Sequence, residues 1–496
     1  MLKNYLLFLL LLSLFSCGKK ETNVVFTPTF TESATTTHTI PEGQNYTFGY
    51  VEVLENRENP AGNTIKLPVY IFKSRSKNPK KDPIIYTVGG PGSSTMRSAQ
   101  YMNYYQYLDD RDFILFEQRG TQHAQPHLDC PEWSEAVYVS NLPDFKETER
   151  DSLFENAATR CRERLTAKGI QLNHYNTNAT AADIEDLRKV LNIESYNLLT
   201  ISYSTKIAQV LLRDYSTHIR SVVMDSPLPL AVNYDEESVA NLMEVVEKLL
   251  SDCETDEKCA ANYPNLKNRF FQYLQDKTEN PLAVEVVNPN TGKPATFYLQ
   301  GKDLITVFTI SNSNSVANVP HEIQKILNND LSSVKAQLAS LFQKPTQFTG
   351  SGIGMRLSVW CAEEYPFATK TVIASEKTNY PEVKGLSPMV FESNICDIWS
   401  VQSAKAIENK AVQSDVPVLV LSGEYDSETP VKWASQLQKK FPNSYHVTFK
   451  GWKHTVTTNW SNPCGMEVAN AFFNDPSSKP NPACFGEIKP LKFKVE

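Results

Sequence analysis

Three residues of the types that combine in nucleophilic catalysis occur along the chain in the order Ser202, Asp426 and His454. A serine hydroxyl attacks a carbonyl carbon when a neighbouring imidazole accepts its proton and a carboxylate fixes the tautomer of that imidazole. We therefore hypothesise that His454 is the base for Ser202 and later protonates the leaving group. A single histidine in a loop is more often a surface residue, so the hypothesis depends on the elements that carry the three residues.

Each of the three residues follows a segment with the composition of a β-strand. Residues 196–200 are predicted to be a strand and 206–215 a helix, which places Ser202 at a sharp strand-to-helix turn. The strand predicted over 416–422 ends shortly before Asp426, and the strand predicted over 445–449 ends shortly before His454. A histidine after the last strand, preceded by an aspartate after the previous strand, is unlikely to occur there by chance.

The turn at Ser202 has an unusual composition. In α/β-hydrolases the nucleophile lies in Gly-x-Ser-x-Gly, because the tight turn demands small residues two positions before and after it. The corresponding residues here are Thr200 and Ser204. Both are small, but each carries a Cβ atom that can strain or reshape the turn. Taken alone, Ser202 could also be a helix N-cap residue.

A glycine-rich loop over 89–92 follows another predicted strand, 83–88. Glycine lets the backbone approach a substrate closely. The N–H groups of Gly90 and of Tyr203, the residue after the serine, are therefore the candidate donors of an oxyanion hole. A plain turn is the alternative. A phosphate-binding loop is excluded because no Gly-Lys-Ser or Gly-Lys-Thr follows.

Strands and helices alternate over much of the chain, which predicts a mostly parallel sheet with helices on both faces. Residues 48–54 and 64–74 are expected to form a hairpin, and 180–183 to cap a helix. The alternation is lost over 229–412, which is polar and rich in helix formers. The predicted division is a first part of the core over 39–228, a large, mainly helical cap over 229–412, and a second part of the core over 413–496.

Composition excludes several classes of protein. The chain has 496 residues, of which 41% are hydrophobic and 21% charged, as is typical of globular proteins. The net charge of -7 offers no basic excess to neutralise phosphates, so no nucleic-acid partner is expected. Neither Cys-x-x-Cys nor His-Glu-x-x-His occurs, so we expect no metal and no other cofactor.

The N-terminus has the pattern of an export signal over 1–16. Lys3 precedes an apolar run over 6–15 that is too short to span a bilayer. Its end resembles a bacterial lipobox, which predicts that Cys17 becomes a lipidated N-terminus and that 17–38 includes a polar tether. An ordinary signal peptide with a chance cysteine is the alternative. With the lipobox, we expect an anchor in the outer membrane, facing the periplasm or the cell surface.

Without Cys17, eight of the nine cysteines remain. An even number in an exported chain predicts disulfides, although spacing alone leaves many pairings open. The simplest arrangement joins neighbours: Cys130 with Cys161, Cys253 with Cys259, Cys361 with Cys396, and Cys464 with Cys484.

Several motifs in the same order resemble those of the tripeptidyl and prolyl aminopeptidases of the α/β-hydrolase fold. The matching segments are 89–92, 117–121, 175–188, 197–205, 224–227, 361–363, 396–399 and 426–430, followed by His454. Departures include Val88 and Glu117, where the family has histidine and aspartate, and both glycines of the turn. The resemblance implies an α/β-hydrolase fold with a cap, and a serine peptidase that removes residues from the N-termini of short peptides.

Such enzymes need an anion that holds the α-amine of the substrate. The candidate is Glu363, with Glu364 as a neighbour; the alternative is that both are ordinary solvated carboxylates. Arg119 is expected to be structural, pairing with loop carboxylates or carbonyls. The cap is expected to act as a lid that restricts access to short peptides.

Three hypotheses about function remain open on the sequence alone. The leading one is an exo-aminopeptidase that works through an acyl-enzyme on Ser202. The second is an esterase or amidase acting on non-peptide substrates. The third is a lipoprotein that binds peptides with impaired catalysis, as the altered turn could indicate. The retention of Ser202, Asp426 and His454 argues against the third, since a site without catalysis has no chemical reason to keep all three.

Overall fold

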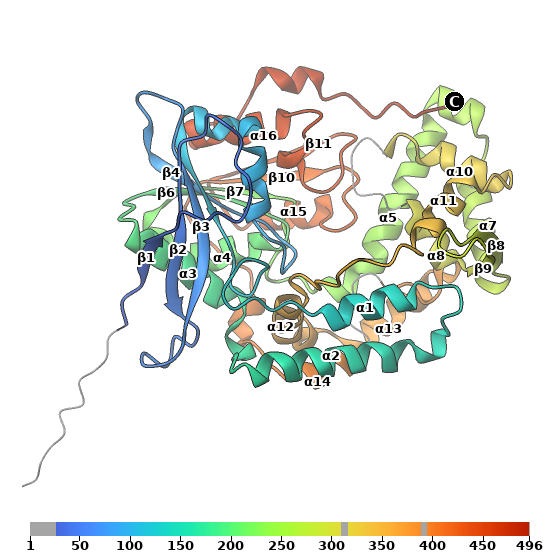
Figure 1. The fold of residues 1–496 in the computed structure, drawn as a ribbon. Coiled ribbons are helices and arrows are strands. Elements are labelled where there is room, and N and C mark those ends of the chain that lie inside the picture. The colour runs from blue at the N-terminus through green and yellow to red at the C-terminus, as the bar shows by residue number, and fades with distance from the viewer. Residues whose placement is uncertain (1–25, 309–315, 388–393, 496) are drawn as a thin grey trace, which may run out of the picture.

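The computed structural model describes residues 26–308, 316–387 and 394–495. The predicted signal peptide and Cys17 lie outside the described residues. A sheet occupies one side of the molecule and a largely helical region the other (Figure 1). Of the helices that the structure describes, none combines the length and the apolar composition needed to cross a membrane.

The sheet has nine strands, and their arrangement confirms the predicted mostly parallel core. In spatial order they are β1 (Thr29–Glu32), β2 (Tyr46–Leu54), β3 (Thr64–Phe72), β5 (Arg111–Phe116), β4 (Lys80–Thr87), β6 (Tyr196–Ile201), β7 (Ile219–Asp225), β10 (Val418–Gly423) and β11 (Ser444–Phe449). Strands β1, β2, β3 and β5 pair antiparallel, and β2 with β3 is the predicted hairpin. From β5 to β11 all neighbours are parallel.

Helices cover both faces of the sheet, so every residue of β6 and β10 is buried. The covering helices are α3 (Thr177–Val190), α4 (Ser204–Asp214) and α15 (Val431–Gln438) on one face, and η1 (Met96–Tyr104) and α16 (Cys464–Asn474) on the other. Leu211 of α4 and Phe472 of α16 show the pattern, since each packs into the apolar core on its own side. The sheet is therefore enclosed as the alternating pattern predicts.

Two helices begin earlier than predicted. Helix α3 begins at Thr177 and is not capped by 180–183, because the side chain of Asn176 accepts the N–H of Ala179 (2.9 Å). Thr180 lies in the first turn, where its hydroxyl donates to Asn176 O (3.0 Å). Helix α4 begins at Ser204, directly behind the turn that carries Ser202.

The segment 229–412 is mainly helical. Its helices and strands are α5 (Tyr234–Thr255), α6 (Glu257–Asn262), α7 (Leu266–Glu279), β8 (Leu282–Val287), β9 (Pro294–Leu299), α8 (Gly301–Phe308), α10 (Val319–Leu327), α11 (Ser332–Ser340), α12 (Ile353–Glu363), α13 (Lys370–Asn379) and α14 (Ile395–Trp399). The β8–β9 hairpin was not predicted. Leu250, Phe270 and Ile323 belong to an apolar core within this region that is separate from the two cores on the sheet.

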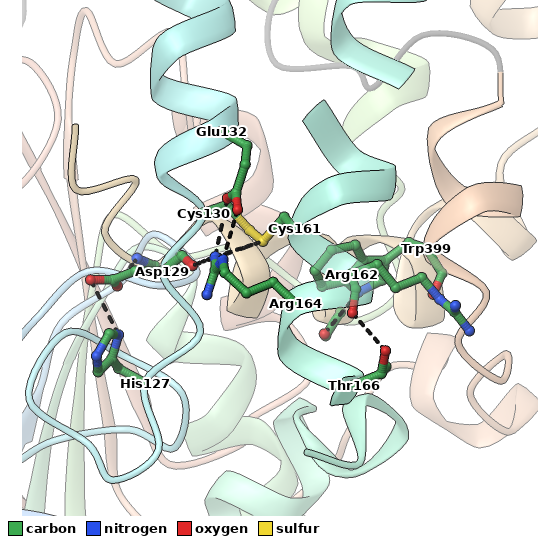
Figure 2. Close-up of a disulfide and its surroundings, with 11 residues drawn as sticks. His127, Asp129, Cys130, Glu132, Cys161, Arg162, Arg164, Thr166 and Trp399 are labelled. Carbon is green, nitrogen blue, oxygen red and sulfur yellow. Dashed lines mark hydrogen bonds and ion pairs between the residues drawn. A yellow bond between two sulfur atoms is a disulfide. The ribbon is translucent and has the colours of Figure 1, made fainter. Parts of the chain in front are cut away.

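Two segments from outside 229–412 also contact this helical region. Helix α1 (Pro131–Ser140) packs against α2 (Arg150–Ala167), and α2 lies beside α14, where the guanidinium of Arg162 donates to Trp399 O (2.9 Å; Figure 2). Near the C-terminus, Lys494 N donates to Ala317 O (2.8 Å). Residues 131–167 and the chain around Lys494 thus join 229–412 in the helical region, whereas the sequence predicts a cap formed by 229–412 alone. The sequence could not show this, because the joining contacts are between residues far apart in the chain.

Four disulfides join neighbouring cysteines, and this is the pairing that the sequence analysis favoured. They are Cys130–Cys161, Cys253–Cys259, Cys361–Cys396 and Cys464–Cys484. The first holds the start of α1 against α2 (Figure 2). Beside it, Arg164 donates to Glu132 Oε1 (2.7 Å) and to Asp129 O (2.6 Å), so covalent and polar contacts fix the same corner.

Candidate active site

Ser202 lies at the turn between β6 and α4, with a φ of +57°. A residue with a side chain rarely adopts this left-handed conformation, so its surroundings must stabilise it. Ser202 N donates to Asp225 O (2.9 Å), and Thr205 N donates to Ser202 O (2.9 Å). Strand, sharp turn and helix together have the form of a nucleophile elbow.

The two residues that replace the usual glycines fit this elbow through hydrogen bonds. Thr200 is buried in β6, and its hydroxyl donates to Val223 O (3.2 Å). Ser204 Oγ accepts the N–H of Ile201 (2.8 Å) and lies 2.8 Å from the carbonyl oxygen of Thr87, to which it donates. The added Cβ atoms therefore do not prevent the turn, and the Ser204 hydroxyl links it to β4.

The glycine loop packs directly against the elbow. A Cβ atom on Gly89 would lie 2.7 Å from Ser202 Cβ and 2.9 Å from Tyr203 N, so only glycine fits at that position. Gly90 has a φ of +117°. The structure thus brings the loop and Tyr203 together, as expected for an oxyanion hole. Gly89, which the sequence analysis did not single out, makes this contact; the donor role of Gly90 stays a prediction.

Two buried side chains that directly follow β5 support the glycine loop. Gln118 Nε2 donates to Val88 O (2.5 Å), at the start of the loop. Glu117, which replaces the aspartate of the resembling family, accepts the N–H of Thr95 (2.8 Å) just after the loop. The longer glutamate side chain is therefore accommodated here as a support for the loop.

Arg119 is buried and has the structural role predicted for it. Its guanidinium donates to both carboxylate oxygens of Asp183 in α3 (2.7 Å each) and to Glu55 O (2.9 Å). A bidentate pair of this kind fixes geometry as well as charge. It holds the segment after β5 against α3, which packs beside the helix that follows the elbow.

His454 and Asp426 form a hydrogen-bonded pair. His454 Nδ1 lies 2.8 Å from Asp426 Oδ2. The buried carboxylate of Asp426 also accepts the hydroxyl (2.8 Å) and the N–H (2.9 Å) of Thr429. With Nδ1 held in this way, Nε2 is the ring nitrogen left to exchange protons with a serine. Thr429 fixes the carboxylate, a role that its place in the sequence motif did not reveal.

The three candidate catalytic residues follow β6, β10 and β11, which lie in the order β6-β7-β10-β11 in the sheet. Because parallel strands end at the same edge, Ser202, Asp426 and His454 gather along that edge. The strand between them, β7, ends in Asp225. This residue connects the elbow to the histidine loop.

Asp225 and Ser226 hold both loops at once. The carbonyl oxygen of Asp225 accepts the N–H of Ser202, as described above, while its buried carboxylate accepts the N–H groups of Val456 (3.0 Å) and Thr457 (2.8 Å). Ser226 Oγ accepts the N–H of Thr455, next to His454 (2.9 Å). In the sequence, these residues stand out only as part of the family-like segment 224–227. An aspartate directly at a strand end is the one signal that could have marked them.

Charge around His454 favours the imidazolium form. Burial lowers the pKa of His454, but Asp426, Glu428 and Asp225 outweigh burial and raise it to about 9. Burial likewise raises the pKa of Asp426, but the charge and hydrogen bond of His454, with those of Thr429, hold it below its usual value. Glu428 Oε2 lies 3.7 Å from His454 Nε2, the ring nitrogen that Asp426 does not bind.

Glu363 and Glu364 lie in a buried network between α12 and the elbow helix. Glu363 accepts the N–H (2.7 Å) and the hydroxyl (2.5 Å) of Thr177, and that hydroxyl also contacts the Tyr203 hydroxyl (2.8 Å). Glu364 forms an ion pair with Lys206 of α4. An amine anchor at either residue stays a prediction, and binding a substrate amine there requires breaking these contacts.

The helical region reaches the glycine loop itself. A Cβ atom on Gly92 would lie 2.3 Å from Gly352 O, directly before α12. On the other side of the site, Trp433 Nε1 donates to Glu237 of α5 (3.0 Å). The cap therefore contacts the core both beside the glycine loop and beside the helix that follows Asp426.

Two family models match parts of the chain, and solved structures resemble it weakly. The family described as alpha/beta hydrolase fold matches residues 82–302, and the family described as TAP-like protein matches residues 385–484. An alpha/beta hydrolase fold protein from Chitinophaga pinensis has a TM-score of 0.37 and 12% sequence identity, over 83% of this chain and 94% of that one.

Relatives of the chain include proteins named as peptidases and one named as a carboxylesterase. Tripeptidyl aminopeptidase from Streptomyces coelicolor is 23% identical over 84% of this chain and 78% of its own. Serine protease Hip1 from Mycobacterium tuberculosis is 21% identical over 88% and 86%, respectively. Carboxylesterase B from Mycobacterium tuberculosis is 21% identical over 87% and 84%.

The fold and the family matches define an α/β hydrolase that acts as a serine hydrolase of the peptidase type. Within that class, the chain is similar to the TAP-like α/β hydrolases. The expectation drawn from the sequence motifs about fold and family is thereby confirmed.

The raised pKa of His454 gives a testable pH dependence. The imidazole must be neutral to accept a proton, so kcat/KM should rise with pH along a limb near pH 9, well above the ordinary histidine value of 6.5. Glu428→Gln removes one cause of the increase and should move the limb to lower pH. Initial rates between pH 5 and 10 measure this, with Glu279→Gln, an exposed carboxylate at the end of α7, as control. A limb near 6.5 in the unmodified enzyme contradicts the assignment.

A second prediction concerns Asp225. In Asp225→Asn an amide NH₂ replaces one acceptor and faces the backbone donors of the histidine loop, so His454 loses its position. We expect kcat to fall about 100-fold with a much smaller change in KM. The melting temperature should also fall, because buried donors lose their partner. Asp475→Asn, at an exposed carboxylate, is the control. Unchanged kcat in Asp225→Asn would refute the positioning role.

Proposed function

We propose that the protein is an exo-aminopeptidase that cleaves short peptides near their N-termini through an acyl-enzyme on Ser202. The observation that carries this proposal is the Asp426–His454 pair, whose loop is tied through Asp225 to the elbow that holds Ser202. The names of the Streptomyces and Mycobacterium relatives support a peptide substrate.

Each group has a defined role in the proposed mechanism. His454 Nε2 takes the proton of the Ser202 hydroxyl as Oγ forms a bond to the scissile carbonyl carbon. Tyr203 N–H and the glycine loop stabilise the charge on the carbonyl oxygen. The imidazolium, held by Asp426, then donates its proton to the leaving nitrogen as the C–N bond breaks. Water, deprotonated by His454, hydrolyses the resulting ester and regenerates Ser202.

The position of the cap favours short substrates and cleavage near a chain end. Gly352 of the cap lies against Gly92, and Glu237 of α5 holds Trp433, so the helical region meets the core on two sides of the site. A folded protein segment would have to displace these contacts to reach Ser202. A short peptide has no such requirement, which supports exopeptidase activity.

The pattern of residues 1–17 leads us to propose that the protein is exported and anchored to the outer membrane by a lipid on Cys17. These residues lie outside the described part of the chain. The four disulfides support an oxidising compartment, because cytosolic reductants keep most thiols reduced.

The nucleophile can be tested by covalent labelling. A fluorophosphonate probe should label the enzyme, and Ser202→Ala should abolish the labelling and lower peptide hydrolysis by about 10⁴-fold or more. Ser478→Ala, at an exposed serine near the C-terminus, should label normally. Labelling that persists in Ser202→Ala would assign the nucleophile to another residue.

The class of substrate can be tested with matched peptides and esters. A peptide with a free α-amine should be cleaved, and its N-acetylated form should react at least about tenfold more slowly, the loss expected when a charged group loses its partner. Mass spectrometry of the products identifies the cleaved bond. The name of the carboxylesterase relative favours the second candidate, an esterase. Simple esters turned over faster than either peptide would support the esterase instead.

A further inference from the structure

Glu428 is a carboxylate at the reacting face of His454. It lies two residues after Asp426, and its backbone N–H donates to Asp426 Oδ1 (3.0 Å), which fixes the start of its side chain. Its Oε2 atom lies 3.7 Å from Nε2 of His454, while Asp426 occupies Nδ1. Its side chain is 50% exposed, so solvent or a substrate can reach it.

The other acidic side chains around the site have internal partners. Asp426 binds His454 and Thr429, and Asp225 binds the backbone of the histidine loop. Glu363 binds Thr177 and Glu364 binds Lys206, and both are buried. Glu428 differs from all four in combining exposure with closeness to the reacting nitrogen.

The chemistry of the proposed mechanism places Glu428 on one side of the scissile bond. Nε2 of His454 must deliver its proton to the leaving nitrogen, so that nitrogen comes within hydrogen-bond distance of Nε2. The acyl side of the substrate faces the glycine loop and Tyr203 N, which hold the carbonyl oxygen. A carboxylate 3.7 Å from Nε2 therefore lies beside the residue that follows the scissile bond.

We propose that Glu428 forms an acidic subsite that binds a positively charged side chain on the residue directly after the scissile bond. The inference rests on the proposed function, because it takes the leaving group to be a peptide. A lysine or arginine ammonium or guanidinium at this place would share the carboxylate with the imidazolium of His454. An acidic side chain there would meet a like charge.

The expected preference is modest, because the carboxylate is half exposed. Exposed ion pairs change a rate by about twofold to fivefold. Neighbouring cations reduce the effect further, because the charge of Glu428 also acts on the partly buried Lys453 and Arg356. Salt should weaken the preference, since mobile ions screen charges in contact with solvent.

The test compares peptides that differ only in the residue after the cleaved bond, which is lysine, glutamine or glutamate. In the unmodified enzyme, kcat/KM should be about twofold to threefold higher for lysine than for glutamine, and lower again for glutamate. The ratio should approach one in Glu428→Gln and reverse in Glu428→Lys. A ratio between two substrates cancels any change in the protonation of His454, because both substrates meet the same enzyme.

Two controls separate the possible outcomes. Glu279→Gln should keep the preference of the unmodified enzyme, and raising the salt concentration should reduce that preference without any substitution. Equal rates for lysine and glutamine peptides in the unmodified enzyme, or a preference that survives in both Glu428 variants, would overturn the subsite and leave the proposed function intact. If no peptide is cleaved while the fluorophosphonate still labels Ser202, both the peptidase proposal and the subsite fail.

Discussion

The active site depends on Asp225, a buried residue at the end of β7. The backbone carbonyl oxygen of Asp225 accepts the N–H of Ser202, and its carboxylate accepts the N–H groups of Val456 and Thr457. The elbow and the histidine loop lie about 250 residues apart in the chain and have no covalent reason to keep a fixed distance. The hydrogen bonds of the buried Asp225 fix that distance, because breaking them would leave polar groups unpaired at a buried position.

A second buried network joins the elbow helix to the cap. Lys206 of α4 pairs with Glu364, directly after α12, and Glu363 at the end of α12 binds Thr177, whose hydroxyl contacts the Tyr203 side chain. Burial raises the pKa of Glu363 to about 7, although the bonds from Thr177 oppose the increase. The residues suggested by the sequence as substrate ligands are thus the ones that fix the position of the cap. Glu428, which the sequence left unnoticed, lies closer to the proposed chemistry.

The altered elbow shows how a strict sequence pattern can change without loss of geometry. Glycine is favoured beside a nucleophile because the strand and helix pack closely there. Ser204 occupies that space and uses its hydroxyl to bond Thr87 O and Ile201 N. A close approach is still required at Gly89, where a Cβ atom would lie too near Ser202 of the elbow. The position that cannot carry a side chain is therefore in the glycine loop.

The sequence by itself determined the order of Ser202, Asp426 and His454, the alternation that builds a parallel sheet, and the neighbour pairing of eight cysteines as the simplest arrangement. These features are local or follow from the order of residues in the chain, so composition and spacing are enough to predict them. Only the tertiary structure decided that Asp225 connects two catalytic loops, that Glu363 and Glu364 have internal partners, and that Glu428 faces His454 Nε2. Each of these is a contact between elements distant in the chain, and the distance between two side chains is set by how whole elements pack, which no local pattern records.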